Sequence, residues 1–131
     1  MNRIPVMCGI LIKDNKVLMS KRHKSKREFN GYWEFPGGKC NINESKEDCI
    51  IREIKEELNV DIEFNKIIYK KKHIKKYNLY FCICNIINDK KIKKNGEIQE
   101  YRYFKTNDIY NLKLLHGDRD IIPRINNYLM N

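Results

Sequence analysis

The chain has 131 residues, and we expect a single domain over residues 1–131 with one hydrophobic core. Hydrophobic residues make up 41%, charged residues 34%, and the net charge is +10, a globular composition that excludes a disordered chain. No apolar run approaches the ~18 residues of a membrane span. The apolar run near Met1 lacks a cleavage site of small residues, so we expect a cytoplasmic protein without a signal peptide.

The positive charge has two interpretations. A basic surface attracts polyphosphates or nucleic acid, whereas a lysine-, isoleucine- and asparagine-rich composition also follows from AT-rich coding. Two lysine-rich runs, 70–76 and 90–94, lie near the ends of predicted strands, where we expect them to be solvated. Because the lysines are spread along the whole chain, we favour solvated lysines that still help to attract an anionic substrate.

The first predicted elements are strands. Strands are predicted over 6–13 and 16–21, joined by a turn at 14–15. A polar loop over 23–30 follows, and then a short aromatic strand over 31–35 that a Pro-Gly-Gly loop ends.

The clearest element is a helix over 45–59. Ser45 and Asp48 resemble a capping box at its start. One apolar stripe at helical spacing predicts the face that packs on the core, and it consists of Ile50, Ile51, Ile54 and Leu58.

Further strands and a terminal helix follow. The mixed order of strands and helices favours a mixed sheet with helices packed on it, an α+β arrangement. The predictions are strands over 60–70, 77–87 and 100–104, a hairpin-type turn at Asn95-Gly96, a helical turn over 106–110, and a helix over 118–129 that buries Ile121, Ile122, Ile125 and Leu129.

The five cysteines are an odd number, and no pair has the spacing of a zinc site. We therefore expect small buried side chains that stay reduced. Two of them, Cys82 and Cys84, lie two apart in a predicted strand, so their side chains should point the same way. The others are Cys8, Cys40 and Cys49.

Three carboxylates share one face of the predicted helix over 45–59. Glu53, Glu56 and Glu57 stand at i, i+3 and i+4, beside the apolar stripe. Their mutual repulsion disfavours the helix unless a cation lies among them, and Arg52 is a partial neutraliser. Carboxylate oxygens suit Mg²⁺ or Mn²⁺ better than Zn²⁺. A glutamate-rich face is more often solvated, so these residues alone do not identify a metal site.

The string from Gly38 to Val60 resembles the Nudix box. The family pattern is matched by Gly38, by Glu44 and by the run Arg52-Glu53-Ile54-Lys55-Glu56-Glu57-Leu58-Asn59-Val60. Asn59 is the one departure, because the family has glycine there. Asparagine is the next most tolerant residue for the left-handed backbone that this position needs, so we expect activity to survive.

The resemblance extends to the MutT-type branch of the family over nearly the whole chain. The segments that carry it are 33–39, the basic pair Lys21-Arg22, and Leu115-His116-Gly117-Asp118, which is similar to a base-reading loop. The family implies an α/β/α sandwich around a central mixed β-sheet.

The resemblance also implies roles for the box residues. Glu56 and Glu57 would be metal ligands, together with the backbone carbonyl of Gly38. Glu53 would be the general base or the activator of a metal-bound water, and so belongs to the same metal site. Arg52 would orient Glu53 by a charge-assisted hydrogen bond. The implied cofactor is Mg²⁺ or Mn²⁺.

Residues outside the core of the box receive roles in the same way. Glu100 resembles a later carboxylate that joins the metal site, with Glu97 as the alternative. Glu44 is assigned a structural or outer role. Arg22 and Lys39 are candidates for holding the outer phosphates, and solvent exposure is the alternative for both.

Base recognition remains the least determined part of the predicted site. We expect one aromatic side chain among Trp33, Tyr80 and Phe81 to touch the base, although aromatic residues in strands usually belong to the core. Asp118 either reads the base or caps the C-terminal helix, and Asp120 takes over the cap in the first case.

Three functions are compatible with the sequence. The favoured one is cleavage of nucleoside triphosphates to nucleoside monophosphate and pyrophosphate, as in sanitation of oxidised nucleotides such as 8-oxo-dGTP or hydrolysis of pyrimidine triphosphates. The alternative is removal of pyrophosphate from RNA 5′ ends, favoured by the charge but not by any added RNA-binding segment. A non-catalytic nucleotide-binding module is disfavoured by the intact Arg52, Glu53, Glu56 and Glu57. We expect no membrane partner; the base, the sugar and the choice between monomer and homodimer stay open.

Overall fold

Strand β1 runs through the middle of a seven-stranded mixed sheet. The computed structural model describes residues 3–22, 31–73, 76–115 and 119–130. β1 (Ile4–Lys13) pairs in parallel with β6 (Tyr77–Asn88) and antiparallel with β2 (Lys16–Arg22) and β4 (Gly37–Lys39), which makes the sheet mixed, as predicted. The elements are β1 (Ile4–Lys13), β2 (Lys16–Arg22), β3 (Trp33–Glu34), β4 (Gly37–Lys39), α1 (Lys46–Leu58), β5 (Asp61–Lys72), β6 (Tyr77–Asn88), β7 (Ile98–Lys105), the 3₁₀-helix η1 (Thr106–Asn111) and α2 (Ile121–Met130).

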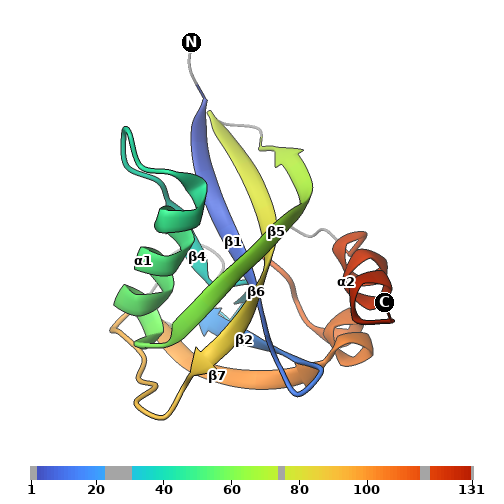
Figure 1. Cartoon of the computed structure of the whole chain (residues 1–131). Helices are drawn as coiled ribbons and strands as arrows, with labels where there is room; N and C mark the ends of the chain where they lie inside the picture. The colour runs from blue at the N-terminus through green and yellow to red at the C-terminus, as the bar shows by residue number, and fades with distance from the viewer. Residues whose placement is uncertain (1–2, 23–30, 74–75, 116–118, 131) are drawn as a thin grey trace.

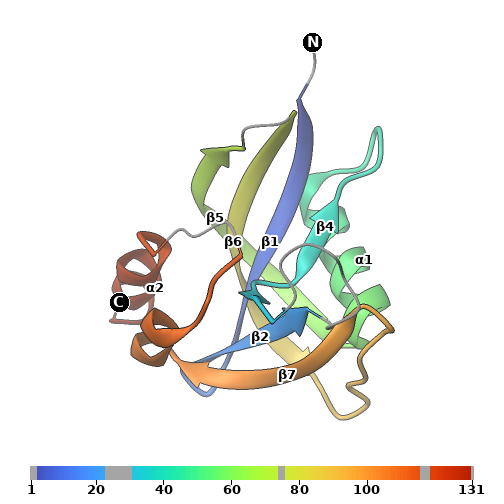
Figure 2. The same cartoon turned by 180° about the vertical axis from the view of Figure 1, so that it is seen from behind.

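The two helices cover opposite faces of the sheet (Figures 1 and 2). Side chains alternate along β1, so Met7 and Leu11 pack with the apolar stripe of α1, whereas Ile10 and Ile12 pack with α2. The α/β/α arrangement is therefore confirmed. Ile54 of α1 is fully buried, so truncating it to alanine should cost about 2–5 kcal/mol of stability.

Helix α1 begins and ends where the sequence predicts. The Asp48 N–H donates to the Ser45 side-chain oxygen over 3.1 Å at the first turn. Asn59 ends the helix with φ 55° and ψ 42°, in the left-handed region, and its N–H donates to the Lys55 carbonyl. The rotation places Ile50, Ile54 and Leu58 in the core and leaves glutamates on the neighbouring face.

Two predicted strand features were wrong. The segment 31–35 forms only the two-residue strand β3, and the following glycines form a separate strand, β4, paired with β1. The turn at Asn95-Gly96 does not close a hairpin, because β6 pairs with β1 and β5 while β7 pairs with β2. The loop before β7 instead docks on the end of α1, through the Lys93 N–H and the Leu58 carbonyl. A two-residue turn signal is local and does not determine which strands pair.

The C-terminal helix is α2, and the apolar residues predicted to face inward do so. Ile121, Ile122 and Ile125 are fully buried, and Leu129 is partly buried against them. Asp118 lies outside the described residues. No helix in the described ranges is long and apolar enough to cross a bilayer.

The cysteines fall into two groups. Cys8, Cys82 and Cys84 are buried free thiols, and the last two face the same way, with sulfurs 3.8 Å apart. Cys40 and Cys49 instead form a disulfide, with Cα atoms 5.2 Å apart. The expectation of five free thiols was therefore wrong for this pair. The loop after β4 turns back over the start of α1 and brings the two residues together.

Candidate active site

A cleft of about 660 Å³ opens beside α1, at β4 and the loop before β7. Its walls combine groups suited to a metal with groups suited to an anionic, aromatic ligand. The carboxylates are Glu34, Glu53, Glu57 and Glu97, the cations are Arg22 and Lys39, and the aromatic rings belong to Tyr32, Phe35 and Tyr77.

Glycines allow the backbone of β4 to approach the helix glutamates. A Cβ atom on Gly38 would overlap the carboxylate of Glu53, and one on Gly37 would overlap the carbonyl oxygen of Met7. The Gly37 N–H also donates to the carboxylate of Glu57. Strand β4 therefore holds polar backbone against the two carboxylates that α1 directs into the cleft.

Arg52 connects the helix to the loop before it. Its Nε and Nη2 donate to the two oxygens of Glu44 over 2.7 and 2.9 Å, and Nη2 also donates to the Lys39 carbonyl over 3.2 Å. Its Nη1 donates to Glu53 over 2.9 Å, which is the hydrogen bond expected between them. The hydrogen bonds that Arg52 donates to Glu44, together with one from the Asn41 N–H, lower the pKa of Glu44 to about 2. Glu44 thus holds Arg52 in place, and Arg52 holds Glu53.

Glu56 lies at the rim rather than inside the cleft. Around the helix, Glu57 is about 40° from Glu53 on one side and Glu56 about 60° on the other. The Glu56 side chain is 59% exposed and accepts from Arg52 Nη1 over 3.3 Å. The three glutamates that the sequence groups on one face therefore divide into two that line the cleft and one that borders it.

The carboxylates in the cleft raise one another's pKa values. Burial raises the pKa of Glu57 to about 8, and the nearby charges of Glu34, Glu53 and Glu97 add to the effect. Burial also raises the pKa of Glu53, although the hydrogen bond from Arg52 opposes the shift. A divalent cation among these half-buried carboxylates would offset their mutual repulsion, so the donor set fits Mg²⁺ or Mn²⁺.

A second group of possible metal ligands fits less well. Among the residues that the structure describes, one set of three ligand atoms lies within 4.8 Å of one another, on Cys40, Glu44 and Cys49. The disulfide engages both sulfurs, and Arg52 engages both oxygens of Glu44. The carboxylates of the cleft stand farther apart, which suits an ion that keeps waters and substrate phosphates as ligands.

The later carboxylate in the cleft is Glu97 and not Glu100. Glu100 lies in β7 opposite Lys21, with its carboxylate 3.7 Å from Lys21 Nζ and 3.0 Å from Arg102 Nη2. Glu97 stands one residue before β7 and lines the cleft. Glu97, the alternative that the sequence offered, is therefore the better placed candidate for the metal site, because ion pairs within the sheet engage Glu100.

Glu34 is a cleft residue that the sequence analysis missed. It lies in β3, with its carboxylate 3.5 Å from Arg22 Nε. Burial raises its pKa, against the effect of Arg22. The available signal was its position in the segment 33–39, just before the box. The two predicted cations, Arg22 and Lys39, both line the cleft, and Lys39 Nζ lies 5.1 Å from the Tyr77 ring centroid.

The aromatic residues expected to touch a base lie elsewhere. Phe81 is 3% exposed and meets Phe35 edge-on at 5.9 Å in the core. Tyr80 points to the α1 side of the sheet, between Lys46 and Lys70, whose Nζ atoms lie 4.8 and 5.4 Å from its ring centroid. Neither lines the cleft. Side chains alternate along β6, so Phe81 packs in the core layer on the α2 side and Tyr80 in the layer on the α1 side.

Trp33 is also a core residue, packed edge-on against Phe104 at 5.0 Å. Its carbonyl accepts from the Leu115 N–H over 2.8 Å, so the chain before α2 runs along the cleft wall up to residue 115. The rings that do line the cleft belong to Tyr32, Phe35 and Tyr77, and none of these residues was among the three candidates for contact with the base.

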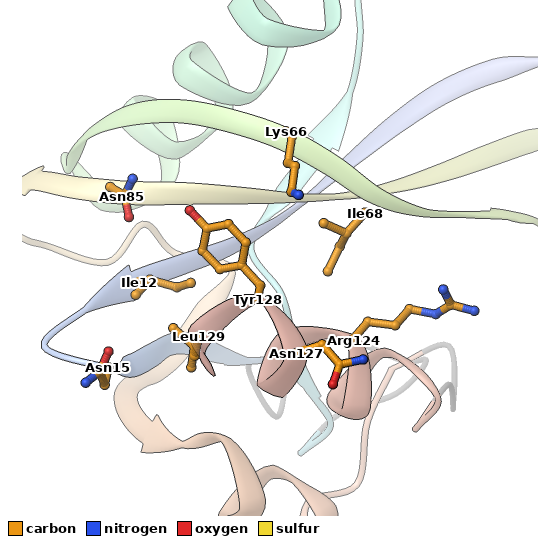
Figure 3. Close-up of a pocket in the computed structure, with 9 residues that line it drawn as sticks. All are labelled: Ile12, Asn15, Lys66, Ile68, Asn85, Arg124, Asn127, Tyr128 and Leu129. Atoms are coloured by element: carbon orange, nitrogen blue, oxygen red, sulfur yellow. The ribbon is translucent and has the colours of Figure 1, made fainter. Parts of the chain in front are cut away.

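A different cavity, of about 500 Å³, lies beneath α2, near the other end of strands β1 and β6 from the cleft (Figure 3). Its charged residues are Lys66 and Arg124, and no carboxylate is among the described residues that line it. Figure 3 shows Tyr128 between strands and helix, with its hydroxyl on the side of Asn85. The concentration of acidic groups is therefore a property of the α1 cleft.

Sequence comparison decides the family. A family model described as the NUDIX domain matches residues 1–125. The chain belongs to the Nudix hydrolase family. An "8-oxo-dGTP diphosphatase" of Buchnera aphidicola is 33% identical over 97 residues, which cover 73% of this chain and 74% of that protein.

Other Nudix relatives match over shorter segments. A "CTP pyrophosphohydrolase" of Escherichia coli and an "8-oxo-dGTP diphosphatase" of Proteus vulgaris are each 36% identical over 61 residues. These matches cover 47% and 46% of this chain, and the chain spans about half the length of the two proteins, 44% and 54%. The crystal structure of a MutT protein from Methanosarcina mazei superposes with a TM-score of 0.79 at 20% identity, over 99% of this chain and 97% of that one. It confirms the Nudix fold.

Proposed function

We propose that this Nudix hydrolase, as a single domain over residues 1–131, cleaves nucleoside triphosphates to a nucleoside monophosphate and pyrophosphate with Mg²⁺ or Mn²⁺ as cofactor. The observation that carries the proposal is that Glu53, Glu57 and Glu97 line one cleft that also holds cations, with Glu53 against the backbone of Gly38 and Glu57 hydrogen-bonded to the Gly37 N–H. Acidic groups suit a metal, and cations beside them suit the phosphates of a substrate.

The residues divide the work. Glu57, Glu97 and the Gly38 carbonyl would hold the cation, with Glu56 reaching in from the rim. A divalent ion there neutralises phosphate charge and makes water more acidic. Glu53 would take the proton from the attacking water, because Arg52 fixes its carboxylate at 2.9 Å and points it into the cleft.

The substrate would lie along the cleft with its phosphates at the glutamate end. Arg22 and Lys39 would contact the outer phosphates. The base would lie between Tyr32 and Tyr77, in the part of the cleft that Leu115 also lines. The names of the relatives favour an oxidised purine or a pyrimidine triphosphate.

Asp118 remains the proposed base reader, and helix capping remains its alternative. The variant Asp118→Ala separates the two when it is assayed on several triphosphates. A base reader loses turnover selectively for the preferred base. A cap loses about 1 kcal/mol of stability and keeps the ranking of substrates.

A second candidate function is removal of pyrophosphate from RNA 5′ ends. It is favoured by ammonium groups that lie over tyrosine rings, that of Lys39 over Tyr77 at the cleft and those of Lys46 and Lys70 over Tyr80 on the α1 side of the sheet, because basic and aromatic groups together suit a nucleic acid. We rank RNA 5′ ends below free nucleoside triphosphates as the substrate. The ammonium groups of Lys46 and Lys70 already lie over the ring of Tyr80, where a base of the RNA would have to stack.

A panel of substrates with Mg²⁺ tests the proposal. The panel contains ordinary nucleoside triphosphates, 8-oxo-dGTP and a 5′-triphosphate RNA, and pyrophosphate and phosphate are quantified separately. We expect pyrophosphate release from mononucleotides, loss of activity with EDTA, and recovery with Mg²⁺ or Mn²⁺. Fast reaction of the RNA with poor use of mononucleotides would favour the second candidate. Release of phosphate alone, or activity that survives EDTA, would contradict the proposal.

A further inference from the structure

Asn59 stands where the family pattern has glycine, and its side chain makes a contact that glycine cannot make. The backbone of Asn59 is left-handed, with φ 55° and ψ 42°. Its side-chain amide donates to the backbone carbonyl of Lys91 over 3.1 Å. Glycine would supply the same backbone conformation but not the amide.

The partner of this hydrogen bond belongs to the loop over residues 89–97, which joins β6 to β7 and lies beside the C-terminal end of α1 (Figures 1 and 2). The last carbonyls of a helix lack partners within the helix, and this loop supplies two. The Lys93 N–H donates to the Leu58 carbonyl over 2.9 Å, and the Asn95 N–H donates to the Glu57 carbonyl over 3.1 Å. The Asn59 amide adds a third attachment at the start of the loop.

The far end of the loop forms a wall of the cleft. The side-chain oxygen of Asn95 accepts from the Glu97 N–H over 2.9 Å, and the Asn95 carbonyl accepts from the Ile98 N–H over 3.2 Å. Asn95 and Glu97 both line the cleft, where the charge of Glu97 acts on Glu57. The way in which the loop sits on α1 therefore sets where the Glu97 carboxylate stands relative to the carboxylates of the helix.

We propose that Asn59 is a positioning residue for the metal site, because its amide holds the loop that carries Glu97 against the end of α1. The inference rests on the proposed function in that it takes the cleft to bind a divalent cation. It adds that the departure from the box pattern is compensated within this chain, by a hydrogen bond that the family glycine does not offer.

The variant Asn59→Gly isolates the amide. Glycine is the residue best suited to a left-handed helix end, so α1 keeps its termination and the thermal stability should not fall. Only the attachment to Lys91 is lost. We expect about threefold to tenfold weaker binding of Mn²⁺, measured by electron paramagnetic resonance of the free ion, which is the range expected for one net hydrogen bond.

Two further variants make the test specific. Lys91→Ala keeps the backbone carbonyl that accepts the bond, so Mn²⁺ affinity should stay at the wild-type value. Glu97→Gln removes the group that the loop delivers, so adding Asn59→Gly to it should cause no further loss. Unchanged Mn²⁺ affinity in Asn59→Gly, or a full additional loss in the double variant, would overturn the inference.

The same titrations separate the inference from the proposed function. Mn²⁺ binding that depends on Asn59, in a protein that hydrolyses no nucleoside triphosphate, would support the positioning role and reject the proposed reaction. If Mn²⁺ affinity and the rate of hydrolysis are both unchanged in Asn59→Gly, the positioning role alone is rejected. A wild-type protein that binds no Mn²⁺ would reject both.

Discussion

The two cavities of this protein lie on one face of strands β1 and β6, at opposite ends of these strands, and have similar volumes, about 660 Å³ for the cleft beside α1 and about 500 Å³ beneath α2. Their chemistry differs. The α1 cleft holds four carboxylates beside two cations, whereas the α2 cavity holds two cations and, within the described residues, no carboxylate. In the α2 cavity, Lys66 lies over the Tyr128 ring at 5.6 Å and Arg124 over the Tyr69 ring at 4.5 Å.

The difference shows what a reactive cleft requires beyond volume. Acidic side chains brought together out of water repel one another, and the raised pKa of Glu57, to about 8, follows from its burial and from that repulsion. The surrounding structure holds them there through Arg52, which donates to Glu53, and through the Gly37 N–H, which donates to Glu57. A cation bound in the α1 cleft would reduce the repulsion between its carboxylates. Among the described residues that line the α2 cavity there is no carboxylate, so no such repulsion arises there.

The largest effect should come from removing the proposed base. Glu53→Gln keeps the size of the side chain and lies outside the core, so the fold should persist while kcat falls by about 10²–10⁴. Circular dichroism checks the fold, and initial rates of pyrophosphate release give kcat. The matched change in the α2 cavity, Lys66→Gln, should leave kcat at the wild-type level. Near-normal turnover in Glu53→Gln would remove Glu53 from its role.

A smaller effect should separate the two candidates for the later carboxylate. Glu97→Gln should weaken Mg²⁺ activation by about tenfold, since it removes one charged ligand from the cleft. Glu100→Gln should change it little, because Glu100 is paired with Lys21 and Arg102 outside the cleft. Activity measured against Mg²⁺ concentration gives the Mg²⁺ activation constant of each variant. A larger effect at Glu100 than at Glu97 would show that the sheet ion pairs open during catalysis.

The smallest effect concerns stability against pH in the metal-free protein. The pKa of Glu57 is about 8 in the folded state and near its ordinary value of 4.5 when unfolded, so the folded state holds more protons between these pH values. Stability should therefore fall as pH rises from 5 to 8, by about 2–5 °C in Tm. Glu57→Gln should reduce this fall, and saturating Mg²⁺ should offset it. A metal-free Tm that rises over this range would contradict the electrostatic account of the cleft.

The sequence predicted the parts of the site that lie within one helix and its preceding loop. The spacing of Arg52, Glu53 and Glu57 fixes their directions around α1, and Gly38 follows from the box pattern. Helix periodicity is local, so these relations do not depend on the rest of the fold.

The sequence did not predict relations that depend on how distant strands pair. Glu97 lines the cleft and Glu100 does not, because β7 pairs with β2 and the loop before it docks on α1. Phe81 and Tyr80 alternate across β6, but alternation does not tell which face meets the cleft, and here neither side chain does. Glu34 enters the site from a strand of only two residues.

The disulfide between Cys40 and Cys49 was not predicted for the same reason, because it depends on the path of a loop in space. A separation of nine residues carries no information on how the loop between them returns to the helix.

The most direct measurement of the central claim is an anomalous difference map from crystals of the protein soaked in Mn²⁺. The account predicts a peak in the α1 cleft, bordered by Glu53, Glu57 and the Gly38 carbonyl, and no peak in the α2 cavity. The absence of a cleft peak at saturating Mn²⁺, or a map whose strongest peak lies among Cys40, Glu44 and Cys49, would contradict it.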